Sequence, residues 1–469
     1  MSTTLNYSLA DLSKLKIHFI GVGGAGMSGI ARIMLAKGFS ISGSDKNDSP
    51  MLTSLKALGA KIEIGHDAKN LGDADLVIIS SAIGEKNPEL MAAKTKGLPI
   101  AARAIALAWL MSDSTSVAVA GTHGKTTTTA MLTVALQSAG VDPSFAIGGT
   151  INTAGTNAHS GSGSIFVAEA DESDGSFLAY KPSGAIITNI ELDHVDHFAN
   201  EDEVFAVFEQ FVDSIKPNGF LVACGDDDGV HNLLKRIKRK DLKVHLYGKS
   251  DKNDFRIEKI HLAPTTSTAS ISSTGRKIGE LKLAVAGEHN LLNALAAFAA
   301  ASALGITEEK VVNGLGTFTG TRRRFELKGE VSGIKVIDDY GHHPTELIVT
   351  LKAAKNLAQA GRVLVIFQPH RYSRTAAFAN QFSQALSLAD FTYLLEVYAA
   401  SEKPIKGINS RTMVETIKQL GHKDISHIKD HDDILKIIEA TSDSFDIFVT
   451  QGAGSVSDVC ELIKDKWKI

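Results

Sequence analysis

A glycine-rich loop that ends in lysine and threonine is the most informative chemical feature of the sequence. It follows the apolar run 117–120 and opens a helical pattern. Glycines let backbone N–H groups approach phosphate oxygens, lysine neutralises the outer phosphates, and a threonine hydroxyl can ligate Mg²⁺. An ordinary glycine turn before a helix is the alternative. The loop predicts a nucleoside triphosphate site formed by Gly121, Thr122, His123, Gly124, Lys125, Thr126 and Thr127.

Acidic and imidazole side chains follow two further predicted strands of the same region. Glu169, Asp171 and Glu172 come directly after one strand, and His194 comes shortly after the next. Ligands of open parallel sheets bind at the carboxyl ends of the strands. A Mg²⁺ ion on nucleotide phosphates needs hydroxyl and carboxylate ligands, and a second ion can accept nitrogen. We predict Thr126 and Glu169 on one ion and His194 on a second, with acidic surface loops as the alternative.

A second glycine loop lies near the N-terminus. Gly21-Val-Gly-Gly-Ala-Gly26 fits the pattern G-x-G-x-x-G between a strand and a helix, and Asp45 ends the next strand. This arrangement predicts a diphosphate at a helix N-terminus, with Asp45 near a ribose. NAD, FAD and a uridine diphosphate sugar all fit it, and so does a tight turn without a ligand.

Polar and cationic groups also follow two predicted strands nearer the C-terminus. One loop contains Tyr340 and His342, and the next contains His370, Arg371 and Arg374. Two arginines spaced i, i+3 can both face one carboxylate, and a neutral histidine can take a proton from an ammonium group. These loops predict a site for a substrate that carries a carboxylate and an amine.

Two other segments carry polar groups whose chemistry suits a nucleotide. His289 and Asn290 enter an alanine-rich helix, where an amide can read an adenine edge or simply cap the helix. The run Arg322-Arg-Arg324 beside Phe325 suits a polyphosphate clamp across a domain cleft. Exposed charge alone would explain the arginines as well.

The elements that must position these residues alternate between strands and helices in three blocks, which indicates an α/β protein. We predict domains at residues 1–113, 114–316 and 317–469, with the polar segment 110–116 between the first two. Strands are expected at 17–20, 40–44 and 76–80, then at 164–170, 185–188 and 220–223, and finally at 335–338, 362–368, 393–397 and 447–450. A helix is expected at 291–304.

Composition and charge narrow the class of protein. The 469 residues carry a net charge of −4 and are 43% hydrophobic, which indicates a soluble multidomain enzyme and gives no global attraction to nucleic acid or an anionic membrane. Neither a membrane-spanning stretch nor a secretory signal is expected, so we predict a cytoplasmic protein without membrane insertion. Cys224 and Cys460 are expected to pack in the core rather than to form a disulfide or zinc site.

Taken together, these segments resemble the Mur ligases, which are ATP-dependent amide-forming enzymes of peptidoglycan precursor synthesis, across essentially the whole chain. The family is indicated by Gly121–Thr126, Glu169, Asp193-His194, His289-Asn290 and Arg323-Arg-Phe325. The branch that adds L-alanine to UDP-N-acetylmuramate is indicated by His18–Ser28, Asp338–Pro344 and Phe367–Arg374. The resemblance implies a Rossmann-like UDP-binding domain, a central P-loop ATPase-like domain and a Rossmann-like C-terminal domain that binds the amino acid.

The resemblance also implies a role for each candidate residue. UDP-sugar binding would fall to Gly24, Ala25, Gly26, Met27, Ser28, Ser44, Asp45, Ser81, Asn152 and Glu172. ATP would be bound by the phosphate loop together with His289, Asn290, Arg324 and Asp339, and the amino acid by Tyr340, His342, Arg371 and Arg374. Catalysis would depend on Lys125, His194, Arg324 and His342. The cofactors would be ATP and Mg²⁺, with Mn²⁺ as a substitute.

The implied reaction joins L-alanine to the lactyl carboxylate of UDP-N-acetylmuramate through an acyl phosphate and releases ADP and phosphate. The protein would act as a monomer or homodimer. A related ligase that adds a preformed peptide to the same nucleotide sugar is an alternative. Two others come from different classes: an NAD-dependent oxidoreductase that uses the Gly21–Gly26 loop, and a non-catalytic nucleotide-binding regulator.

Overall fold

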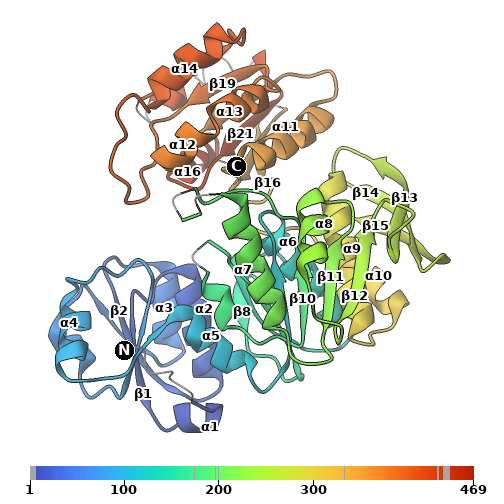
Figure 1. Ribbon diagram of the computed structural model, residues 1–469. Coiled ribbons are helices and arrows are strands. Elements are labelled where there is room, and N and C mark those ends of the chain that lie inside the picture. The colour runs from blue at the N-terminus through green and yellow to red at the C-terminus, as the bar shows by residue number, and fades with distance from the viewer. Residues whose placement is uncertain are drawn as a thin grey trace.

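The computed structural model describes residues 7–468 except 174, 196, 199, 332, 430–432 and 437–443. Within these residues the strands form three sheets, one in each predicted block (Figure 1). The C-terminal block, orange to red in Figure 1, lies above the other two. The α/β class and the three-domain organisation expected from the sequence are therefore confirmed.

The N-terminal sheet is parallel throughout, in the order β3-β2-β1-β4-β5. Its strands are β1 Lys16–Ile20, β2 Ser40–Asp45, β3 Lys61–Ile64, β4 Leu76–Ile79 and β5 Ile100–Ala102. Its helices are α1 Leu9–Leu12, α2 Ala25–Ala36, α3 Pro50–Ala57, η1 Ala68–Leu71, α4 Pro88–Thr95 and α5 Arg103–Met111. The strand order reverses between β1 and β4, so the glycine loop after β1 lies where such sheets bind ligands.

The central sheet has the order β15-β14-β13-β12-β11-β10-β6-β9-β7-β8. Its strands are β6 Thr115–Ala120, β7 Ser144–Ile151, β8 Thr156–His159, β9 Ile165–Glu169, β10 Gly184–Ile187, β11 Phe220–Cys224, β12 Lys243–Gly248, β13 Phe255–Leu262, β14 Ser267–Ser273 and β15 Arg276–Leu283. Its helices are α6 Lys125–Ser138, η2 Ser176–Ala179, α7 Glu201–Asp213, α8 Asp228–Arg236, α9 Glu288–Ala303 and α10 Glu308–Gly316. Because β6 lies between β9 and β10, the acidic loops after those strands flank the phosphate loop.

The C-terminal sheet has the order β16-β17-β21-β18-β19-β20, and only its edge strand β16 is antiparallel. Its strands are β16 Glu326–Val331, β17 Ile334–Asp339, β18 Val363–Phe367, β19 Phe391–Leu394, β20 Ile425–His427 and β21 Ile447–Gln451. Its helices are α11 Pro344–Ala358, α12 Tyr372–Ala377, α13 Ala379–Leu386, α14 Ser410–Gln419 and α16 Val456–Trp467. The two polar loops predicted from the sequence leave β17 and β18 at the same edge.

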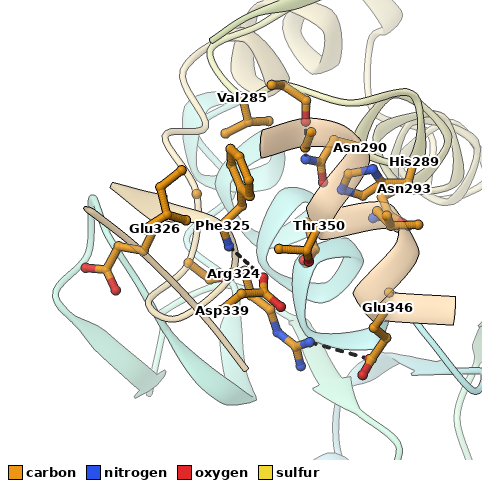
Figure 2. A pocket seen from close by; sticks show the side chains of 18 of the residues that line it. Val285, His289, Asn290, Asn293, Arg324, Phe325, Glu326, Asp339, Glu346 and Thr350 are labelled. Atoms are coloured by element: carbon orange, nitrogen blue, oxygen red, sulfur yellow. Dashed lines mark hydrogen bonds and ion pairs between the residues drawn. The ribbon is translucent and has the colours of Figure 1, made fainter. Parts of the chain in front are cut away.

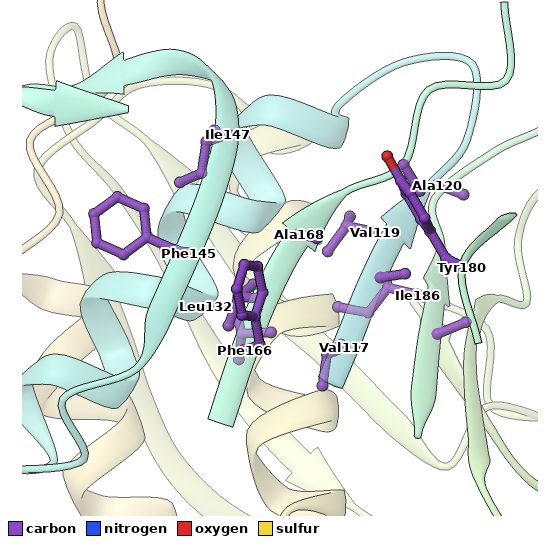
Figure 3. Packing of buried hydrophobic residues seen from close by; sticks show 14 of the residues in the cluster. Val117, Val119, Ala120, Leu132, Phe145, Ile147, Phe166, Ala168, Tyr180 and Ile186 are labelled. Atoms are coloured by element: carbon purple, nitrogen blue, oxygen red, sulfur yellow. The ribbon is translucent and has the colours of Figure 1, made fainter. Parts of the chain in front are cut away.

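Buried apolar side chains on the central strands explain why these segments form a covered parallel sheet. Val117, Val119, Phe166 and Ile186 are fully buried, and Figure 3 shows them on neighbouring strands with Leu132 of α6 beside them. Strands buried on both faces read as continuous apolar runs, which is how they were recognised in the sequence.

The domains differ in how they share their cores. One continuous apolar cluster extends from the N-terminal sheet into the central sheet. The C-terminal sheet instead has separate clusters, one centred on residues such as Leu351 and Phe382 and another on residues such as Phe448 and Ile463. The C-terminal domain therefore has its own core and meets the central domain mainly through the contacts described below.

A few sequence expectations differ from the structure in detail. The strand expected at 393–397 is β19, Phe391–Leu394, because the chain leaves the sheet to bring Tyr398 beside His370. Both cysteines are buried and free, as expected. Among the described residues, no helix is long and apolar enough to span a membrane.

Glu89 of α4 is a buried carboxylate that the sequence did not single out. One of its oxygens accepts from His18 Nε2 and from the Ser44 hydroxyl, both at 2.7 Å, and the other accepts from His66 Nδ1 at 3.0 Å. Burial alone would raise the pKa of Glu89, but the hydrogen bonds from His18, Ser44 and His66 outweigh it and lower the pKa. Glu89 therefore ties β1, β2 and the loop after β3 together.

We expect Glu89→Gln to lower the free energy of unfolding of the N-terminal domain by about 3 kcal/mol, because the buried donors lose a charged acceptor. Hydrogen exchange of peptides from residues 16–45 measures this locally. Because folding lowers the pKa of Glu89, the ionised carboxylate adds to the free energy of unfolding at pH values above the usual pKa of glutamate. This contribution is lost as the pH falls through the lowered pKa. Unchanged exchange in the variant at pH 7 would contradict this role.

Candidate active site

The phosphate loop is a rigid turn pinned by the loop that follows β10. Gly121 and Gly124 have φ angles of 130° and 82°, which glycine adopts without strain. The backbone N–H of His123 donates to Asn189 Oδ1 at 2.8 Å, and the Thr188 hydroxyl donates to the His123 carbonyl at 2.6 Å. Helix α6 begins at Lys125, so its unpaired N–H groups face the loop.

Lys125 is held at the centre of this loop. Its ammonium group donates to the Gly121 carbonyl at 2.7 Å and pairs with Glu172 Oε1 at 2.9 Å. Burial lowers the pKa of Lys125, but Glu172, Asp171 and Glu169 together raise it, so the lysine is charged at neutral pH. Burial raises the pKa of Glu172 to about 7 against the opposing effect of Lys125.

Two groups of side chains have the chemistry of cation ligands. The Thr126 hydroxyl donates to Glu169 Oε1 at 3.0 Å, which brings together the two ligands predicted for one Mg²⁺. Ligand atoms of Asp171, Glu172 and His194 lie within 4.8 Å of one another. Burial lowers the pKa of His194, so its imidazole is neutral and has a lone pair for a metal. Hard oxygen ligands suit Mg²⁺, and the nitrogen suits the second position.

A cavity of about 680 Å³ lies between the central and C-terminal domains (Figure 2). Figure 2 shows His289, Asn290 and Asn293 on one side and Arg324, Phe325 and Asp339 on the other. Asp339 accepts from the backbone N–H of Phe325 and of Gly341, both at 2.8 Å. Several residues predicted to bind ATP, among them Asn290, Arg324 and Asp339, therefore line one cavity that opens beside Gly124 and Thr127.

A second cavity, of about 710 Å³, brings the other predicted groups together. It is lined by Ala25 and Met51 of the N-terminal domain and by residues from both other domains. The central domain contributes Lys125, Thr126, Glu169 and His194, and the C-terminal domain contributes Tyr340, His342, His370, Arg371 and Arg374. A phosphate, a carboxylate and an amine can therefore meet here.

Arg374, predicted to bind an amino acid, is engaged across the domain interface. Its guanidinium donates to Asp193 Oδ1 through Nε at 2.9 Å and through Nη2 at 2.8 Å, and both side chains are almost fully buried. Burial would raise the pKa of Asp193, but Arg374 and the nearby histidines hold it well below its usual range. Asp193 therefore competes with any substrate carboxylate for this arginine.

Arg371 is positioned by a carboxylate that the sequence analysis missed. It has a φ angle of 70°, in a region rare for a bulky residue, and its Nη1 lies 3.6 Å from Glu402 Oε1. Glu402 also accepts from the Ser373 hydroxyl at 2.6 Å. A single glutamate in an irregular loop gives no periodic signal, so only the folded chain identifies it.

His342 has the properties of a proton acceptor. Its Nδ1 lies 3.2 Å from the Tyr340 carbonyl, which fixes Nδ1 as the donor and leaves the lone pair on Nε2. Burial, more than the opposing effect of Glu346, lowers its pKa to about 4. The imidazole is therefore neutral at physiological pH.

The N-terminal glycine loop has the predicted geometry, but some of the residues predicted to bind the nucleotide sugar are buried or bonded to other groups of the protein. The Gly23 N–H donates to Asp45 Oδ2 at 2.8 Å, and α2 begins at Ala25 without a side-chain cap. Ser44 is fully buried and donates to Glu89, so its hydroxyl is not exposed to a ligand. Met27 and Ser28 are likewise buried in α2, whereas Gly24 and Ser81 are exposed.

Two residues predicted to bind the nucleotide sugar lie in the central domain. Asn152 is exposed beside the first cavity and donates to the Thr319 carbonyl at 3.2 Å. Glu172 is buried and pairs with Lys125. One therefore lies at the cavity lined by predicted ATP residues, and the other contacts the lysine of the phosphate loop.

Comparisons with known proteins cover nearly the whole length of the chain. Models of the Mur ligase family match three consecutive segments: "Mur ligase family, catalytic domain" at residues 16–115, "Mur ligase middle domain" at 119–301 and "Mur ligase, glutamate ligase domain" at 323–454. A UDP-N-acetylmuramate–L-alanine ligase from Renibacterium salmoninarum is 48% identical over 461 residues, which are 98% of this chain and 97% of that protein.

Solved structures agree with this likeness. The UDP-N-acetylmuramate-alanine ligase of Thermotoga maritima is 30% identical, with a TM-score of 0.82, and the match covers 97% of this chain and 99% of that one. A murein peptide ligase from Psychrobacter arcticus is 27% identical, with a TM-score of 0.75 and the same coverage.

We expect Gly121→Ala to weaken binding of ADP and ATP at least tenfold, about 1.4 kcal/mol or more. An added Cβ would lie 2.1 Å from Thr188 Oγ1, at a φ angle that alanine rarely adopts. Isothermal titration calorimetry measures the affinity. Gly279→Ala in β15 is the matched control, because a Cβ there meets nothing within 4 Å. Equal affinity for ADP and ATP in the two variants would contradict this prediction, because it would show that the loop can move away from Thr188 and still bind the nucleotide.

Proposed function

The chain belongs to the Mur ligase family, and we propose that it joins L-alanine to the lactyl carboxylate of UDP-N-acetylmuramate, using ATP and releasing ADP and phosphate. The observation that carries the proposal is the second cavity, where the phosphate loop meets polar loops of the C-terminal domain and residues of the N-terminal domain. A ligation of three substrates needs such a meeting point. We assign residues 1–113 to the nucleotide sugar, 114–316 to ATP and 317–469 to the amino acid.

ATP is required because a carboxylate does not condense with an amine in water. Transfer of the γ-phosphoryl group turns the carboxylate into an acyl phosphate, whose phosphate is a good leaving group. Lys125 and Arg324 lie where they can stabilise the charge on the transferred group, and Arg324 Nη2 lies 3.3 Å from the Thr126 hydroxyl. Mg²⁺ held by Thr126 and Glu169, with a second ion at His194, would neutralise charge on the phosphates.

The second half of the reaction uses the C-terminal loops. In our proposal Arg371 binds the carboxylate of L-alanine, while Tyr340 and His342 border its amine. Nε2 of His342 accepts a proton as the amine attacks the acyl phosphate, and the tetrahedral intermediate then expels phosphate. Arg374 can join the amino-acid site only by sharing its guanidinium with Asp193.

The closest competing function changes only the acceptor. A murein peptide ligase shares the fold at 27% identity, so addition of a preformed peptide is the second candidate. The 48% identity to an alanine ligase over nearly the full length favours the single amino acid. The proposal also places the enzyme in the cytoplasm, where ATP and nucleotide sugars are made.

Phosphate release from ATP and Mg²⁺ tests the proposed function directly. We expect release only when UDP-N-acetylmuramate and L-alanine are both present, with a product heavier by one alanyl residue by mass spectrometry. Turnover with a tripeptide but not with L-alanine would assign the protein to the peptide-adding branch. The absence of phosphate release with both L-alanine and the tripeptide would contradict the ligase assignment.

We expect His342→Gln to lower kcat by about 10²-fold or more, because the amine loses its proton acceptor. Since the pKa of His342 is about 4, wild-type enzyme keeps the neutral imidazole down to about pH 5. The pH profile of kcat/KM for L-alanine measures this. A wild-type inflection near pH 6.5 that disappears in the variant would contradict the lowered pKa.

A further inference from the structure

Glu346, in the first turn of α11, lies between the phosphate loop and the amino-acid loop. Its Oε2 accepts from the backbone N–H of His342 at 2.8 Å and of His343 at 3.2 Å. Its Oε1 lies 3.2 Å from Nδ1 of His123, in the phosphate loop, and 3.8 Å from Nη1 of Arg324. One oxygen of the carboxylate, Oε2, therefore binds the backbone of its own domain, whereas Oε1 reaches the phosphate loop of the central domain. Figure 2 shows the ion pair between Glu346 and Arg324.

His123 is a buried cation that faces a carboxylate from each domain. Nε2 contacts Glu191 of the central domain, and Nδ1 faces Glu346 of the C-terminal domain. Burial would lower the pKa of His123, but Glu346 and Glu191 raise it to about 10.

The interface around this contact is polar and directional. Thr345 Oγ1 lies 3.3 Å from Glu191 Oε2, and Arg374 reaches Asp193 from the same side. The apolar clusters of the C-terminal domain are built almost entirely from its own side chains, with Val195 of the central domain packed against one of them. Separating the two domains therefore breaks charge pairs whose geometry requires close docking.

Helix capping alone does not account for Glu346. The residue completes a capping box with His343 at the start of α11. A capping box uses one oxygen, and glutamine serves there as well as glutamate. The second oxygen and the charge are used by His123 and Arg324, which lie outside the helix.

We infer that Glu346 is a positioning residue that links docking of the C-terminal domain on the phosphate loop, through His123, to the placement of His342. This inference rests on the proposed function, in which the phosphate loop binds ATP and His342 accepts the proton of the amine. One end of the carboxylate contacts the nucleotide loop and the other holds the backbone of the base. Docking of the two domains therefore adds the His123 contact to the same carboxylate that holds the backbone of the base.

Glu346→Gln separates the two roles of the residue. The glutamine oxygen keeps the capping bond, so α11 should fold, whereas the charge that attracts His123 and Arg324 is lost. His123→Asn breaks the same contact from the other domain, because the shorter side chain does not reach Glu346. Glu415→Gln is the matched control, since Glu415 is exposed on α14.

Steady-state kinetics with all three substrates provide the first measurement. We expect each variant to lower kcat about tenfold with the KM for UDP-N-acetylmuramate unchanged within twofold, and the double variant to be no slower than the slower single. The control should match wild type. Additive effects of the two substitutions, or a normal kcat in Glu346→Gln, would overturn the inference.

Hydrogen exchange of residues 340–347 gives a readout that does not depend on turnover. We expect faster exchange there in His123→Asn, although the substitution lies in another domain, and the same in Glu346→Gln. Unchanged exchange in His123→Asn would overturn the link between the domains. A wild-type enzyme inactive with L-alanine would instead contradict the proposed function and leave this structural result intact.

Discussion

Close packing of the phosphate loop against the loop after β10 is the constraint on which the rest of the site depends. Even a Cβ at Gly121 would meet the Thr188 hydroxyl, and the side chains of Thr188 and Asn189 bind the backbone of His123. This contact fixes where α6 begins and so where Lys125 and Thr126 point. Because β6 lies between β9 and β10, the same contact brings the acidic loops to the phosphate side of the sheet.

Several charges in this site are buried beside a counter-charge. Lys125 pairs with Glu172, Arg374 pairs with Asp193, and His123 is flanked by Glu191 and Glu346. Burial of an unpaired ion costs far more than its exposure, so these pairs form together or not at all. In the proposed reaction, substrate phosphates and carboxylates must enter by sharing or displacing the existing partners.

The two kinds of domain contact have different mechanical consequences. The N-terminal and central domains share one apolar cluster, and its separation would expose a large hydrophobic area. The C-terminal domain is attached through polar pairs and has cores of its own. Movement of the C-terminal domain is therefore the less costly of the two, and residues at that interface can change partners during a reaction cycle.

The sequence by itself determined the most apolar strands, such as β1, β6 and β18, together with the three blocks and the chemistry of each loop, because apolar runs, glycine turns and residue types are local properties of the chain. It did not reveal strands such as β3 or β13–β15, whose residues do not form continuous apolar runs. Lys125, Thr126, Glu169 and His194 were identified in this way. Only the tertiary structure decided which polar side chains meet, including Glu346 with His123 and Glu89 with His18. These partners lie far apart in the sequence, and a lone glutamate reads as solvent-exposed until folding buries it beside a donor.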